Sequence, residues 1–210
     1  MGKDNKKIWD RYARFYDFEI LRFNKKAYQE MYHMIKDILN EKMDVLEIAT
    51  GTGLIAINIA DGVNTIEAID FSPKMIDTAN SKDIPSNVHF SVQDATALTF
   101  EECKFDAVII SNALHIIRNP EVVLENIKRV LKPNGTLIAP TYSHGHISDS
   151  SWNLSNFLLK FVGFESSAKW KPEEYVSFIE ENGFVVTNWK VLDAAFPLVY
   201  LEARKKEKLQ

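Results

Sequence analysis

The chain has 210 residues, 46% hydrophobic and 26% charged, which suits one buried core and excludes the composition of a disordered chain. A net charge of -4 argues against DNA or RNA as partners, because nucleic-acid binding needs a basic face. Cys103 is the only cysteine, so no internal disulfide can form. The start lacks the apolar core of a signal peptide and no run is long enough to span a membrane, so we expect a cytoplasmic protein.

The N-terminal region, residues 8–39, carries aromatic side chains at spacings of three and four, as on one face of a helix. The stripe consists of Trp9, Tyr12, Phe15 and Tyr16. Packing of this stripe on the core is one interpretation. A role over a ligand is the other, and it depends on the motifs that follow.

An apolar run, a glycine turn and a helix follow one another at residues 43–60. Residues 45–49 indicate a buried parallel strand in which Glu47 is the one charged residue. Gly51 and Gly53 allow a sharp turn and a close approach of the backbone to a ligand. The free N–H groups at the start of the next helix favour an anionic group, so the sequence predicts a nucleotide pocket.

Two interpretations of this turn are open from the spacing alone. Gly51-x-Gly53-x-x-Ala56, with Asp70 at the end of the next strand, fits the dinucleotide fingerprint of a nicotinamide-dependent oxidoreductase. A tight connection between strand and helix, with no ligand, would also need the glycines.

Strand-like and helix-like runs alternate along the chain, which is typical of an α/β fold with helices on both faces of a parallel sheet. The expected strands are 44–49, 65–69, 88–92, 105–110 and 135–140, and the expected helices are 53–60, 73–80, 120–131 and 172–182. Two closely linked runs, 184–192 and 198–203, must pair antiparallel. We expect one domain over residues 1–210.

Five blocks in this alternation carry a family resemblance. They are Glu47-x-Ala49-x-Gly51-x-Gly53 and residues 68–75, 90–95, 105–115 and 129–137. In this order they resemble the motifs of the class I S-adenosylmethionine-dependent methyltransferases of the small-molecule type. The resemblance implies a Rossmann-like, doubly wound, mostly parallel sheet of seven strands with the last strand antiparallel, N-terminal helices and a helical insert after strand five. Ala49 and Thr50 depart from the family's usual residues and narrow the space beside the cofactor.

The resemblance also implies which residues bind S-adenosylmethionine and its product S-adenosylhomocysteine. The backbone of Gly51 to Gly53 would receive the amino-acid end, and Asp70 both ribose hydroxyls. Glu47 would approach the amino group of the donor, or instead cap local backbone. The further candidate contacts are Tyr12 and Tyr16 from a cap over residues 1–40, Ala49, Thr50, Phe71, Met75, the adenine-binding pair Asp94 and Ala95, and Asn112 and Leu114 after strand four.

Methyl transfer requires donor and acceptor to be held in line and water to be excluded, so no catalytic triad is needed. An aromatic face at Tyr12 or Tyr16 attracts a sulfonium by about 0.5 to 2 kcal/mol. A base is needed only if the acceptor loses a proton, and His115 is the first candidate, although it can equally be a wall of the pocket. His144-Gly145-His146 lacks further ligands, so no metal is expected.

The insert at 141–171 is rich in bulky apolar residues and is expected to be a lid, a dimer contact or a contact with a membrane surface. The leading prediction is a methyltransferase for a small, lipid-like or quinone-like acceptor, acting as a monomer or homodimer. A nicotinamide-dependent oxidoreductase and a module that binds the cofactor without catalysis are the alternatives.

Overall fold

The computed structural model describes residues 9–10, 13, 16–18, 22–143, 168–194 and 197–206. The elements in the described part are, in chain order, α2 (Lys25–Ile38), β1 (Asp44–Ile48), α3 (Leu54–Ile59), the short 3-10 turn η1 (Ala60–Gly62), β2 (Thr65–Asp70), α4 (Pro73–Asn80), β3 (Val88–Val92), β4 (Phe105–Ile110), α5 (Pro120–Val130), β5 (Leu131–Ile138), β6 (Thr141–Tyr142), α7 (Pro172–Glu181), β7 (Phe184–Leu192) and β8 (Leu198–Lys205).

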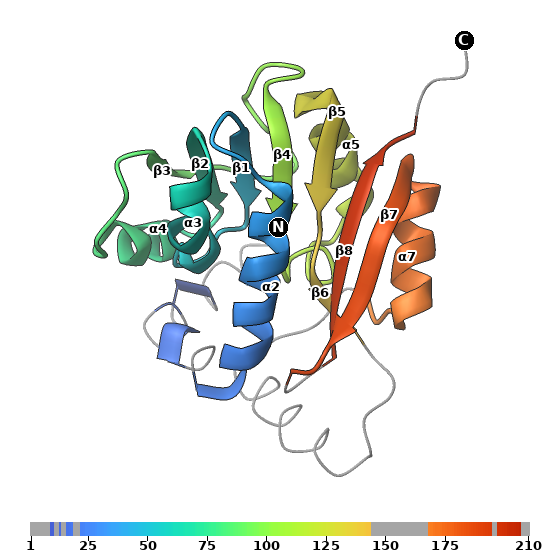
Figure 1. Ribbon diagram of the computed structural model, residues 1–210, viewed down its shortest axis with the longest axis horizontal. Helices are drawn as coiled ribbons and strands as arrows, with labels where there is room; N and C mark the ends of the chain where they lie inside the picture. The colour runs from blue at the N-terminus through green and yellow to red at the C-terminus, as the bar shows by residue number, and fades with distance from the viewer. Residues whose placement is uncertain are drawn as a thin grey trace.

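One sheet of eight strands runs through the molecule in the order β3-β2-β1-β4-β5-β8-β6, and β7 pairs with β8 (Figure 1). Strands β1 to β5 are parallel, whereas β8 is antiparallel to β5, β6 and β7. The expected α/β class and antiparallel last strand are confirmed. The seven expected strands are present, and the two-residue β6 adds an eighth, because β8 extends past the end of β5 and its first residues pair with Thr141 and Tyr142.

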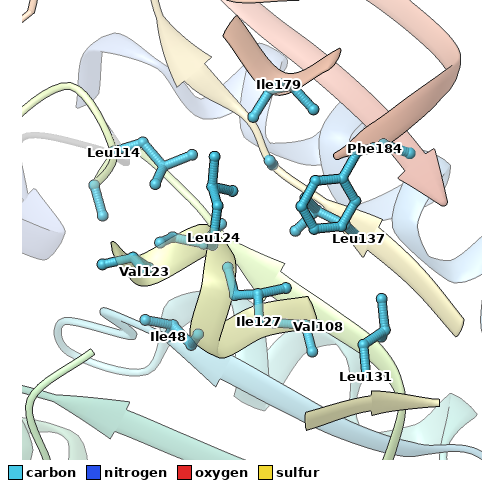
Figure 2. Packing of buried hydrophobic residues seen from close by; sticks show 14 of the residues in the cluster. Ile48, Val108, Leu114, Val123, Leu124, Ile127, Leu131, Leu137, Ile179 and Phe184 are labelled. Carbon is cyan, nitrogen blue, oxygen red and sulfur yellow. The ribbon is translucent and has the colours of Figure 1, made fainter. Parts of the chain in front are cut away.

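Alternation along the strands divides the core between the two faces of the sheet. In β4, Val108 and Ile110 belong to one buried cluster, and Ala107 and Ile109 belong to the other. The first cluster is completed by α5 and α7, as Figure 2 shows for the α5 side chains packed against strand residues. The second is completed by α2 and α3 on the opposite face. Helices therefore pack on both faces of the sheet and support its parallel strands.

Several element boundaries follow from local chemistry. The Ser72 Oγ accepts a hydrogen bond from the N–H of Met75 at 3.2 Å, which caps α4 ahead of Pro73. Gly183 follows α7 with φ +87, a conformation that favours glycine. Strand β5 begins at Leu131 and not at residue 135 as expected. Leu131 is fully buried and pairs with Phe105, and the pairing of β4 with β5 shifts in register after Phe105.

Some expectations concern residues outside the described part. Tyr12, Phe15, His144 and His146 belong to this group, as do residues 144–167 of the apolar insert. Among the described helices, none is both long and apolar enough to cross a bilayer.

Candidate functional site

A pocket lies at the carboxyl ends of the parallel strands, the usual ligand position in open α/β sheets. Five regions line it: the turn after β1, the β2–α4 junction, the segment after β3, the segment after β4, and the N-terminal residues Trp9 and Tyr16. The described N-terminal pieces, drawn in blue, lie on the side toward which the arrowheads of β4 and β5 point (Figure 1).

The glycines of the first turn serve different purposes. Both have left-handed backbones, with φ +57 at Gly51 and φ +79 at Gly53. A Cβ on Gly53 would lie 2.5 Å from the Phe90 ring of β3, so packing on the sheet also requires glycine there. A Cβ on Gly51 would meet only the Tyr16 ring, at 3.8 Å. Gly51 lines the pocket, whereas Gly53 shapes the turn from outside its lining.

Asp70 stands where β2 ends and faces the pocket. Its Oδ2 accepts from the N–H of Gly51 at 2.9 Å, and its Oδ1 accepts from the N–H of Ser72 at 2.8 Å. Burial raises the pKa of Asp70, while these backbone hydrogen bonds act in the opposite direction. Each carboxylate oxygen has a second acceptor position, so the group is fixed in place and can still bind a ligand hydroxyl.

The segment after β3 supplies the second acid. The Asp94 Oδ1 accepts from Thr96 through its N–H at 2.9 Å and its Oγ1 at 2.8 Å. Partial burial acts to raise the pKa of Asp94, but these two hydrogen bonds hold it below its ordinary value. Ala95, Phe71 and Met75 also line the pocket, as the sequence predicts for an adenine site.

Glu47 is buried behind the turn and does not line the pocket. Its Oε2 accepts from the Thr50 Oγ1 at 2.7 Å and from the N–H of Ala56 in α3 at 2.9 Å. Burial raises the pKa of Glu47 to about 8, against the opposing effect of these hydrogen bonds. The carboxyl group therefore caps local backbone, the second of the two predicted roles, and its approach to the donor stays a prediction. Thr50 also lies outside the lining, whereas Ala49 is part of it.

The segment after β4 brings polar atoms to the pocket. Asn112 lines it with a left-handed backbone at φ +52, and its Nδ2 donates to the Tyr28 hydroxyl at 3.1 Å. The Ser111 Oγ and the Asn112 Oδ1 are buried and have no hydrogen-bond partner in the described part of the chain. These are the atoms that a ligand would satisfy.

Two candidates from the same segment do not line this pocket. Leu114 is buried in the first core cluster, beside α5 in Figure 2, because its side chain turns away from the pocket after the strand has ended. His115 is buried, and its Nδ1 lies 2.9 Å from the Thr141 Oγ1. Its ring meets the Tyr142 ring edge to face at 6.4 Å. Its role as a base stays a prediction.

The described N-terminal residues 9–10 and 16–18 cover the pocket, and we call them the N-terminal cover. Polar contacts join this cover to both sides of the pocket. The Ser72 Oγ donates to Asp10 at 2.5 Å, and the Lys82 Nζ lies 2.6 Å from the Asp17 Oδ2. Lys82 also donates to the carbonyl of Thr52 at 2.7 Å, and the Thr52 hydroxyl donates to Asp17. The sequence pattern does not predict these contacts. Their only signal was a pair of aspartates seven residues apart beside the aromatic stripe.

Tyr16 is part of this cover and meets the Trp9 ring edge to face at 6.5 Å. Burial of its hydroxyl raises the pKa of Tyr16 well above the ordinary value, with nearby tyrosines adding to the effect. Tyr16 thus stays protonated at neutral pH and offers an aromatic face and a neutral hydroxyl. Among the described residues, no group of three His, Cys, Asp or Glu side chains is placed to hold a metal ion.

Comparisons with known proteins agree with this geometry. Residues 46–139, which include the turn, both acids and Asn112, match the family model described as a methyltransferase domain. Over these residues the chain carries a methyltransferase domain. The match covers the strands β1 to β5 of this methyltransferase domain, from within β1 to just past β5.

The methyltransferase domain also has relatives of known name. A demethylmenaquinone methyltransferase of Renibacterium salmoninarum is 31% identical over 137 residues, which is 65% of this chain and 57% of the relative. The chain therefore spans little more than half the length of that relative.

Solved structures share the fold over nearly the whole chain. One is a chain in the complex of the Haloferax volcanii Trm112 methyltransferase activator with a candidate methyltransferase, at TM-score 0.81 and 18% identity, covering 98% of this chain and 99% of that one. Another is the complex of DhpI with S-adenosylhomocysteine, at TM-score 0.76 and 18% identity, covering 98% and 97%.

Proposed function

We propose that the pocket binds S-adenosylmethionine and that the protein transfers the methyl group to a small acceptor. The observation that carries this is the convergence of Asp70 and Asp94, from two neighbouring strands, on one pocket floored by the glycine turn. Asp70 would accept from the ribose hydroxyls, and the backbone at Gly51 would face the amino-acid end. Phe71 and Met75 would enclose the adenine, whose amino group would donate to Asp94.

The residues present fit this cofactor in chemistry as well as position. Asp70 keeps acceptor positions that two hydroxyls can use, and the unpartnered Asn112 Oδ1 and Ser111 Oγ need a ligand to satisfy them. When bound, S-adenosylmethionine supplies a methyl group on a positively charged sulfur. Trp9 and Tyr16 would cover that end of the pocket, exclude water and direct aromatic faces at the cation.

For the acceptor we propose a small molecule with an apolar, quinone-like ring. Ala113, Ile116 and Ile117 give the pocket an apolar side next to Asn112, which suits a ring better than a charged group. A relative named as a demethylmenaquinone methyltransferase supports the same class. Among the residues that the structure describes, no strong base lines this side, so His115 or solvent would have to take any proton that the acceptor loses.

Calorimetric titrations with three compounds test which cofactor the protein binds. Titrations of the purified chain with S-adenosylmethionine, S-adenosylhomocysteine and NADH should show binding of the first two and weak or no binding of NADH. A preference for NADH would overturn the proposal and restore the oxidoreductase alternative.

The variant Asp70→Ala tests whether the ribose binds at Asp70. This change removes charge-assisted hydrogen bonds worth about 1.5 to 3 kcal/mol, so S-adenosylhomocysteine should bind at least about tenfold more weakly. Asp61→Asn is the matched control, since Asp61 is an exposed acid paired with Lys36 away from the pocket. Equal affinities in the Asp70 variant and the wild type would show that the ribose lies elsewhere.

An assay with radiolabelled donor distinguishes a protein that catalyses methyl transfer from one that only binds the cofactor. Incubation with methyl-labelled S-adenosylmethionine and naphthohydroquinone, or with a metabolite extract, should label a small extractable product. Absence of any labelled product, while calorimetry shows the donor bound, would favour a module that binds without catalysis.

A further inference from the structure

Tyr28 of α2 joins the elements around the acceptor side of the pocket, although it does not line the pocket itself. The side chain is 4% exposed and its hydroxyl accepts from the Asn112 Nδ2 at 3.1 Å. The hydroxyls of Tyr16 and Tyr142 lie close enough to this hydroxyl to affect its pKa. One buried phenol therefore links α2 to the end of β4 and lies beside the N-terminal cover and β6.

These contacts leave Asn112 in one defined position. Its backbone N–H donates to the carbonyl of Pro140 at 2.8 Å, and its φ of +52 is one that asparagine tolerates better than most residues. One end of the side-chain amide is bonded to Tyr28. The other end, Oδ1, belongs to a residue of the pocket wall and has no partner among the described residues.

An unsatisfied buried acceptor is costly, and native structures retain few of them. Here two lie together, since the Ser111 Oγ next to Asn112 is also buried without a partner in the described part. Both belong to residues that line the pocket, beside the apolar residues Ala113 and Ile116. A ligand that carries a hydroxyl or amine N–H on an apolar ring would satisfy the carbonyl oxygen and fill the apolar space.

We propose that Tyr28 is a positioning residue for the methyl acceptor: its hydroxyl holds the Asn112 amide so that Oδ1 accepts a hydrogen bond from an acceptor O–H or N–H. This inference rests on the proposed function, and adds that the acceptor is recognised as a hydrogen-bond donor. Tyr28 orients the recognising group and does not touch the acceptor.

The change Tyr28→Phe removes the hydroxyl and keeps the ring. Tyr32→Phe is the matched control on the same helix. Its ring packs edge to face on Tyr28 at 6.0 Å, and its hydroxyl makes no hydrogen bond to any described residue. A second variant, Asn112→Gly, deletes the recognising amide while accepting the left-handed backbone.

The measurement is the affinity of the S-adenosylhomocysteine complex for two probes, naphthohydroquinone under anaerobic conditions and its dimethyl ether. They share the ring, but only the first can donate a hydrogen bond. Wild type and Tyr32→Phe should prefer the hydroquinone by about threefold to tenfold, the worth of one neutral hydrogen bond. Tyr28→Phe and Asn112→Gly should both lose that preference, and Tyr28→Phe should keep the wild-type affinity for S-adenosylhomocysteine.

The possible results distinguish a failure of the proposed function from a failure of the role inferred for Tyr28. Failure of the wild type to bind S-adenosylhomocysteine would contradict the proposed function. Normal cofactor binding with no preference between the probes, or a preference that survives in Tyr28→Phe, would overturn the role of Tyr28. If Tyr28→Phe does not fold, Asn112→Gly decides whether the acceptor is recognised through this amide.

Discussion

Ala49 adopts a backbone conformation that suits glycine, with φ +56 in the wall of the pocket. A left-handed backbone costs a residue with a Cβ roughly 1 to 2 kcal/mol. Most positions lose stability when alanine becomes glycine, because the unfolded chain gains freedom worth about 0.4 to 1 kcal/mol. At Ala49 the relief of strain on changing to glycine is larger than the entropy gained by the unfolded chain.

We therefore predict that Ala49→Gly raises the free energy of unfolding by up to about 1 kcal/mol. Urea denaturation measures it. Ala97→Gly, at an exposed residue whose φ is not positive, should lower the same quantity by about 0.4 to 1 kcal/mol. A loss of stability in both variants would show that Ala49 is not strained.

Glu47 makes the stability of the protein depend on pH. Its pKa is about 8 in the folded protein, above the value near 4.3 of an exposed glutamate, so between these values the folded state holds a proton that the unfolded state has lost. The stabilisation is complete below the lower value and is lost as the pH rises through the upper one. Its slope is at most about 1.4 kcal/mol per pH unit.

In Glu47→Gln the titrating group is gone, and the amide oxygen can still accept from Thr50 and Ala56. The variant should thus gain stability relative to the wild type as the pH rises from about 5 to 8. Chemical denaturation at several pH values gives the difference. Parallel curves for the two proteins would mean that Glu47 is ionised in the fold across this range.

At the scale of elements, the N-terminal cover is held by a small number of polar contacts. Lys82, in the loop after α4, bonds both Asp17 of the cover and the carbonyl of Thr52 in the glycine turn. Both charged side chains are only partly exposed, at 23% and 29%, so solvent weakens the pair less than on an open surface. The cover and the turn are therefore coupled through one ammonium group.

Lys82→Met should loosen the cover and speed the dissociation of S-adenosylhomocysteine about fivefold, which corresponds to an ion pair of about 1 kcal/mol. Stopped-flow displacement of the bound compound measures the rate. Lys36→Met removes a surface pair with Asp61 and should leave the rate unchanged. An unchanged rate in Lys82→Met would mean that the cover does not limit release.

Element boundaries were predictable where one residue dominates the local chemistry. Ser72 with Pro73 set the start of α4, and Gly183 set the end of α7. The start of β5 was not predictable, because Pro133 and Gly135 suggest a turn while the burial of Leu131 extends the strand across them. The short β6 exists only because β8 runs beyond β5, which depends on the whole sheet.

At the scale of the whole molecule, parallel strands gather their carboxyl ends at one edge, so motifs far apart in the chain meet there. This is why Asp70, Asp94 and Asn112 could be placed in one pocket from the sequence. Tyr28 could not, because its contact with Asn112 joins residues 84 apart and follows from how α2 packs on the sheet. Leu114 lies in the core and not in the pocket lining, since a residue beyond the strand no longer follows the alternation that the pattern assumes, and its contact with donor or acceptor stays a prediction.

We propose that the nucleoside of the donor lies across the ends of β1, β2 and β3 under the N-terminal cover. A crystal structure of the protein with S-adenosylhomocysteine tests it most directly. We predict density for the ribose against Asp70, for the adenine between Phe71 and Met75 beside Asp94, and for the sulfur facing Tyr16 and Asn112. Density for the compound outside this pocket, or an empty pocket in crystals grown with saturating compound, would contradict the account.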